Sequence, residues 1–183
     1  IFLDGWYKIS QKDYSGAQVS FEKALAVKDN AEKTLSHAGL AQLFEIQKQP
    51  QKAIIAWQSL LQEDPTQIAA YGAWLRQMQE LKRAKEAVTF LSDLEKKTDK
   101  WQPSLVLAQV LALQGQFSDA VKHVDIALER SANSMDVKQV AADLYMKHGL
   151  NLRSQQKLAE AKIIMLKALN FFPSNMLILA NVI

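Results

Sequence analysis

The chain has 183 residues, of which 49% are hydrophobic and 22% charged, with six Gly, four Pro and no Cys. This length suits one compact domain or a short repeat array and is too small for a large multidomain enzyme. A sequence without Cys excludes disulfides, Cys-ligated zinc, iron–sulfur clusters and a thiol nucleophile. The few Gly and Pro residues argue against a turn-rich all-β fold.

Charge excludes one class of partner. Lys and Arg number 22 against 19 Asp and Glu, which gives a net charge of +3. The two signs balance up to residue 139, and the small basic excess lies in 140–183. Only four basic residues are Arg, the residue that most often makes bidentate hydrogen bonds to bases and phosphates. We therefore expect no nucleic-acid partner.

Targeting signals are not evident in the sequence. The most apolar stretch, 163–183, contains Lys167, Asn170 and Pro173, so we expect no membrane span in this chain. The sequence begins at Ile1 rather than Met, and we expect it to be a fragment or a processed product.

A repeated pattern starts with Ala, continues with a large residue four positions later, and ends with a small or apolar residue three positions after that. Its five alanines are 36, 34, 33 and 41 residues apart: Ala17, Ala53, Ala87, Ala120 and Ala161. Helical spacing places such residues on one face, where the small Ala admits a neighbouring helix. A period near 34 predicts a helix–turn–helix repeat.

The pattern divides the chain, in order, into repeats at about 1–31, 34–67, 68–100, 101–133 and 134–175, with a partial repeat at 176–183. A second amphipathic stretch precedes the Ala helix in the middle repeats, as in Leu40–Phe44 and Leu107–Leu111. Short polar breaks separate the two helices, and Pro65 and Pro173 mark the ends of two repeats.

Two places depart from the period. The interval from Ala120 to Ala161 is about seven residues too long, so either 136–153 is one lengthened helix or 132–134 belongs to a longer loop. The partial repeat, from Asn175, has an apolar face that suits no solubilising end helix: Met176, Leu177, Leu179, Ala180 and Ile183. We expect a fragment of a longer array or, alternatively, a homo-oligomer formed through this last helix.

The chain resembles the tetratricopeptide-repeat (TPR) family. The second repeat matches the family pattern best, with His37, Leu40, Ala41, Phe44, Ala53, Trp57, Leu60 and Pro65. The other four repeats match in part, so the resemblance covers nearly the whole chain. The resemblance implies an all-α, right-handed α-solenoid of about five helix pairs plus one terminal helix, forming a single array over 1–183. It also implies a scaffold or adaptor for protein–protein interaction.

In this family the first helix of each pair lines a concave groove that binds a protein or peptide. The resemblance places these residues there: Trp6, Gln42, Glu45, Arg76, Gln79, Leu105, Gln109, Met146 and Arg153. Gln42, Arg76 and Gln109 would be polar contacts. Leu105 and Met146 would be apolar ones.

The roles of Trp6 and of the groove each have an alternative interpretation. Trp6 either anchors a ligand or contacts a preceding repeat, and the groove either binds a peptide or contacts the rest of a larger protein. Ala38, Gln42 and Ala73 stand where the family's carboxylate clamp has Lys and Asn, so we expect no clamp of that kind.

Catalysis needs converging polar groups. His37, His123 and His148 are far apart in sequence and lack metal-ligand spacing, and His123 is expected on an outer helix face. Asp93 and Glu95 are expected to be solvated, and Trp57 and Trp74 to be core residues. We therefore expect no catalytic residue, no metal and no cofactor.

A weaker resemblance concerns bacterial TPR lipoproteins of PEP-CTERM/exosortase and exopolysaccharide systems. It rests on the run Ala38–Ala41 and on a helix from Ala53 that ends in Asp64–Pro65. It implies a scaffold in the bacterial periplasm or anchored at the outer membrane. A cytoplasmic regulator, a structural or oligomerisation spacer, and an accessory domain of a larger enzyme are the alternatives.

Overall fold

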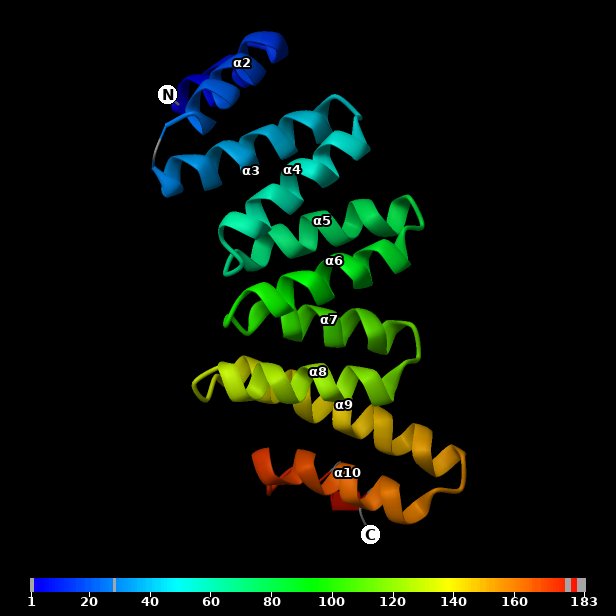
Figure 1. Ribbon diagram of the computed structural model, residues 1–183. Helices are drawn as coiled ribbons and strands as arrows, with labels where there is room; N and C mark the ends of the chain where they lie inside the picture. Colours follow the sequence, from blue (N-terminus) through cyan, green and yellow to red (C-terminus); the bar gives the residue numbers. More distant parts are fainter. Residues whose placement is uncertain (1, 28, 177–178, 181–183) are drawn as a thin grey trace. The chain divides into compact units, whose positions relative to one another are not determined.

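The computed structural model describes residues 2–27, 29–176 and 179–180. These residues form ten α-helices and no strand, and successive helices run back and forth as hairpins (Figure 1). The helices are α1 (Phe2–Ser10), α2 (Tyr14–Leu25), α3 (Asn30–Ile46), α4 (Pro50–Glu63), α5 (Ile68–Glu80), α6 (Ala84–Lys97), α7 (Gln102–Leu113), α8 (Phe117–Arg130), α9 (Met135–Ser154) and α10 (Leu158–Phe171). The predicted all-α class and its five helix pairs are confirmed.

The chain divides into two compact units, Ile1–Ala87 and Val88–Ile183. The N-terminal unit contains α1 to α5 and the start of α6, and the C-terminal unit contains the rest. In both units the five pattern alanines are buried, and so are the large residues four positions later: Phe21, Trp57, Leu91, Val124 and Met165. The repeated pattern is therefore the core of each unit.

Close helix approach in the N-terminal unit depends on two glycines. A Cβ atom added to Gly5 would lie 2.5 Å from Phe21 Cε1, and one added to Gly39 would lie closer still to the same atom. The Trp6 ring meets Phe21 edge-on, with 5.5 Å between ring centroids. The fully buried Phe21 ring is thus confined by α1 and α3 at once.

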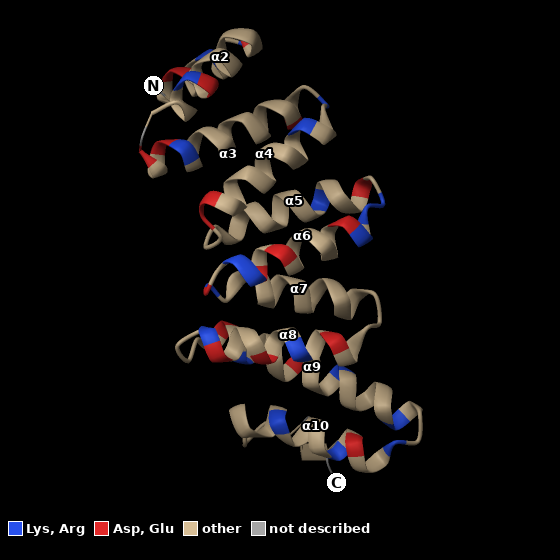
Figure 2. Cartoon of the chain, in the orientation of Figure 1, with Lys and Arg blue, Asp and Glu red and all other residues tan. Residues whose placement is uncertain are grey.

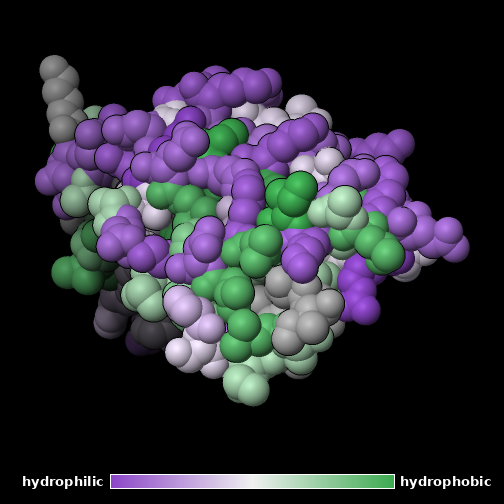
Figure 3. All heavy atoms as spheres, turned by 90° about the horizontal axis from the view of Figure 1, so that it is seen from below, coloured by the Kyte–Doolittle hydropathy of each residue, from purple (hydrophilic) through white to green (hydrophobic). Residues whose placement is uncertain are grey.

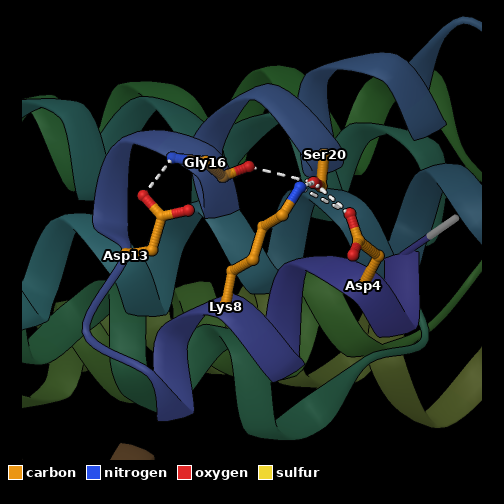
Figure 4. A network of polar contacts seen from close by, with 5 residues as sticks. All are labelled: Asp4, Lys8, Asp13, Gly16 and Ser20. Atoms are coloured by element: carbon orange, nitrogen blue, oxygen red, sulfur yellow. Dashed lines mark hydrogen bonds and ion pairs between the residues drawn. The ribbon is translucent and has the colours of Figure 1, made fainter.

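A polar network fixes α1 against α2 (Figure 4). The Asp4 carboxylate accepts hydrogen bonds from Lys8 Nζ at 2.8 Å and from the buried Ser20 Oγ at 2.5 Å. Lys8 Nζ also donates to Ser20 Oγ at 2.8 Å. Lys8, and then Ser20, lower the pKa of Asp4 below its usual value. Asp13 caps α2 by accepting from the Gly16 N–H at 2.9 Å.

Each helix pair is closed by a three-residue turn whose middle residue lies in the left-handed region. The φ values are 63° for Lys12, 56° for Lys48, 56° for Lys82, 76° for Gly115 and 62° for Gln156. In each turn the third residue's N–H bonds back to the helix, as Gln49 N does to Phe44 O at 2.8 Å. This is the Schellman ending of a helix, in which glycine is favoured at the left-handed position.

Replacing Lys12, Lys48 and Lys82 together with glycine is expected to raise the free energy of unfolding by about 2 kcal/mol. A side chain in the left-handed region costs about 1–2 kcal/mol, which exceeds the extra entropy that glycine loses on folding, about 0.5–1 kcal/mol. All three lysines are exposed, so no packing is lost. Urea unfolding measures the change. Gly115→Ala is the opposite control and is expected to destabilise; lysine-to-glycine variants less stable than wild type would contradict the argument.

The long fourth interval is resolved in favour of a lengthened helix. α9 has 20 residues, whereas α7, the first helix of the preceding pair, has 12. The connection 131–134 before α9 is as long as the connection 98–101 before α7. The alternative of a longer loop is therefore wrong.

The C-terminal end carries exposed apolar side chains. Viewed from below, hydrophobic residues lie among hydrophilic ones (Figure 3), and those exposed on α10 include Leu158, Ile163 and Leu166. Met176, Leu179 and Ala180 are helical, but Leu177 and Ile183 of the predicted oligomer face lie outside the described residues. Homo-oligomerisation through this face stays a prediction. Within the described part of the chain, no helix is both long and apolar enough to cross a membrane.

Candidate binding pocket

A pocket of about 450 Å³ opens between three helices of the N-terminal unit. It is lined by residues of α3, α4, α5 and the connection before α5: Ala38, Gln42, Glu45, Ile46, Trp57, Leu60, Gln67, Ala69, Ala70, Ala73 and Arg76. Helical spacing explains the lining, because residues four and seven after Ala38 share its face, and so do those four and seven after Ala69. The alanines leave the hollow open.

Few charges surround the pocket. Arg76 and Glu80 are the charged residues of α5, and Glu45 is the charged residue in the second half of α3 (Figure 2). Glu45 is half-buried, whereas Arg76 and Gln42 are exposed. The pocket thus combines a small-residue floor with two amides, one carboxylate and one guanidinium at its rim.

Trp57 fixes the carboxylate of the pocket. Its indole Nε1 donates a hydrogen bond to Glu45 Oε1 at 2.9 Å. Trp57 is 5% exposed, so its ring is held by the core and holds the Glu45 side chain in turn. The predicted core role of Trp57 is confirmed, and the residue lines the pocket as well; Trp74 is fully buried as predicted.

The connection that carries Gln67 is held by its own hydrogen bonds. Asp64 accepts from Thr66 Oγ1 at 2.6 Å and from Gln67 Nε2 at 2.7 Å, and these donors lower the pKa of Asp64 below its usual value. The Tyr71 hydroxyl donates to Pro65 O at 2.9 Å, and burial raises the pKa of Tyr71. This wall of the pocket is therefore built before any ligand arrives.

A second hollow of about 260 Å³ adjoins the pocket and shares Glu45 with it. Its other lining residues are Lys48, Gln49, Pro50, Gln77 and Glu80. Glu45 therefore lines two neighbouring hollows beside α3 and α5.

The structure brings together three of the predicted groove residues, Gln42, Glu45 and Arg76. Gln79 is exposed on α5 but lies outside the pocket lining. Trp6 is half-buried against Phe21, so its ring takes part in core packing.

The predicted groove residues of the C-terminal unit are placed differently. Leu105 is 8% exposed and belongs to the core, and the half-buried Met146 packs against that core. Leu105 is buried because its surroundings include residues of both α8 and α9, so it is a core residue rather than an apolar surface contact. Gln109 and Arg153 are exposed, on α7 and α9.

Glu95 is buried, contrary to the expectation that it is solvated. Asp93 is exposed as predicted, but Glu95 is 6% exposed, and both of its carboxylate oxygens lie 3.0 Å from His123 Nδ1. Arg130 donates to the Glu95 backbone carbonyl at 3.1 Å. The interpretation of Glu95 as a solvated helix end is therefore wrong, and the half-buried His123 ring packs against it.

The other two histidines, His37 and His148, belong to different units. Burial lowers the pKa of both His37 and His148. In the described part of the chain, no three His, Asp or Glu side chains gather in a way that would hold a metal ion.

Comparisons with known proteins support the fold. No family model matches the chain, and no curated protein matches it. Among solved structures, it is similar to YrrB, described as a TPR protein with an unusual peptide-binding site, with a TM-score of 0.50, 16% identity and coverage of 96% of this chain and 87% of that one. A structure of MamA matches with a TM-score of 0.50, 19% identity and coverage of 92% and 87%. The chain therefore has the tetratricopeptide-repeat fold that its residue pattern, repeated five times, indicates.

Proposed function

We propose that this chain is a protein-interaction scaffold that binds a peptide segment in the pocket between α3, α4 and α5. The observation that carries the proposal is the convergence of Gln42, Glu45 and Arg76 over a floor of alanines. Peptide ligands need such a combination, since apolar surface supplies affinity and a few fixed polar groups set the orientation.

The comparison with YrrB supports the same function. That protein has the same fold and is described as having a peptide-binding site. The pocket here has the volume of ordinary ligand pockets, which measure about 300–1,000 Å³. Two of its polar side chains are held by hydrogen bonds, Glu45 by Trp57 and Gln67 by Asp64.

Binding fits the pocket better than catalysis does. The residues that line it provide amides, one carboxylate and one guanidinium, and they include no Ser, Thr, Lys or His to serve as a nucleophile or as its activating base. A role in a bacterial envelope system, and the alternatives of a spacer or an accessory domain, stay predictions.

A peptide selection tests the proposal. Purified chain is used to select binders from a displayed random peptide library, and their affinities are measured by isothermal titration calorimetry. The double variant Gln42→Ala, Arg76→Ala is expected to weaken selected peptides at least about tenfold, which corresponds to about 1.4 kcal/mol. Both side chains are exposed, so the thermal midpoint should not change.

The matched control is Gln79→Ala, Gln109→Ala, two exposed glutamines outside the pocket lining. Their loss is expected to leave affinity unchanged. A library that yields no binder, or binders that the two double variants affect equally, would contradict a peptide site in this pocket.

A further inference from the structure

Arg76 differs from Arg83, the other arginine of the N-terminal unit, and from Arg130 of the C-terminal unit. Arg83 is held by Glu86 and Gln51, and Arg130 donates to the carbonyls of Glu95 and Lys100. Among the residues that the structure describes, no hydrogen bond or ion pair reaches the Arg76 guanidinium. Among the described residues, Glu80, one turn further along α5, forms no hydrogen bond or ion pair with the Arg76 guanidinium. The pocket therefore presents a cation whose five donors are available to a ligand.

The opposite charge in the pocket is already engaged. Glu45 Oε1 accepts the Trp57 indole N–H at 2.9 Å, and the side chain is half-buried on α3. Its remaining lone pairs can accept a backbone N–H, but a second carboxylate beside it would be repelled. A ligand with a single acidic group beside Arg76 pairs with that positive charge and avoids repulsion by Glu45.

The two hollows indicate how the ligand continues. Because Glu45 lines both, a segment bound in the larger hollow can extend past Glu45 into the smaller one, beside Lys48 and Gln77. A bound chain that continues in both directions from Arg76 presents a side chain rather than its terminus to the guanidinium. Small or aliphatic neighbours suit the floor formed by Ala69, Ala70 and Ala73.

We propose that the pocket selects an extended peptide segment that presents one internal Asp or Glu side chain to Arg76. The inference rests on the proposed peptide-binding function and adds the ligand's chemistry to it. The guanidinium matches a carboxylate with two parallel N–H···O bonds, which neither an amide nor an amine reproduces. Gln42 and Glu45, on the facing helix, are the groups left to bond the peptide backbone.

Three peptide pools test this proposal on the full chain. Each pool is acetylated and amidated, nine residues long, with a mixture of Ala, Leu and Ser around a fixed central Glu, Gln or Lys. Binding is followed by Trp fluorescence, since the Trp57 ring lines the pocket. We expect the Glu pool to bind about tenfold more tightly than the Gln pool, and the Lys pool to bind most weakly.

Charge reversal supplies the decisive variant. Arg76→Glu is expected to reverse the order, so that the Lys pool binds most tightly. Gln79→Glu adds a negative charge three residues later, outside the pocket, and is expected to keep the preference for Glu. An unchanged order in Arg76→Glu would overturn the proposal.

The remaining outcomes separate this proposal from the function on which it rests. If all three pools bind alike and Gln42→Ala, Arg76→Ala weakens them equally, the peptide site stands and the acidic preference is wrong. If a Gln pool with a free C-terminus binds more tightly than the amidated Glu pool, the ligand's carboxylate is terminal and the internal side chain is wrong. If no pool binds and the library yields no binder, both proposals fail.

Discussion

Replacing Gly5 and Gly39 together with alanine is expected to lower the free energy of unfolding by about 3 kcal/mol. Each new methyl group would enter the space of Phe21, whose Cδ1, Cε1 and Cζ atoms lie against both glycines. Overpacking a core costs about 1–3 kcal/mol per site, and the better helix propensity of alanine returns about 1 kcal/mol at each. The double variant is expected to lose more stability than the two single variants added together, because a ring displaced from α1 is pushed towards α3.

Gly72→Ala is the matched control. Gly72 also lies inside a helix, but a Cβ there meets nothing within 4 Å, so this variant is expected to be stabilised by about 0.5–1 kcal/mol. Urea unfolding followed by circular dichroism measures all variants. Phe21→Leu in the doubly substituted background should recover part of the loss, since it removes the clashing ring edge. A gain in stability for Gly39→Ala, as for Gly72→Ala, would show that Phe21 is packed elsewhere.

His123→Ala is expected to destabilise the C-terminal unit by about 2 kcal/mol. The change leaves the buried Glu95 carboxylate without the imidazole that lies 3.0 Å from both of its oxygens. Breaking a fully buried pair by removing one partner costs about 3–5 kcal/mol. The His123 side chain is 24% exposed, so water reaches the site and reduces the loss.

A second substitution shows whether the loss comes from the stranded charge. Glu95→Met in the His123→Leu background replaces both groups with apolar ones and is expected to restore most of the stability. Asp119→Ala, on the same helix, removes one side of an exposed ion pair with Lys122 and is expected to change stability far less than His123→Ala does. Equal losses of stability in His123→Ala and Asp119→Ala would mean that the Glu95–His123 pair stabilises the fold no more than an exposed ion pair does.

The helix pairs were predictable because their signal is local. The pattern at Ala53 and Trp57 repeats with the period of the elements that it forms, and both residues are buried where the pattern requires. The length of α9 was not predictable, since a longer helix and a longer loop fit the same interval. Packing decided between them, with Val137, Ala141 and Ala142 buried along the extra turns.

The site was predictable only in part. Gln42 and Arg76 were placed by register alone, and both line the pocket. The same register placed Leu105 on the surface, where neighbouring helices bury it instead. Glu95 was misjudged because its partner His123 lies 28 residues away on α8, and no local pattern records such a contact.

The position of the pocket has a thermodynamic consequence. Every residue that lines it belongs to Ile1–Ala87, so a ligand adds its binding free energy directly to the folded state of that unit. The increment is RT ln(1 + [L]/Kd), about 2.7 kcal/mol when the ligand concentration is about 100 times Kd. Occupancy of the proposed site would therefore raise the resistance of Ile1–Ala87 to unfolding, protease cleavage and hydrogen exchange as the partner's concentration rises.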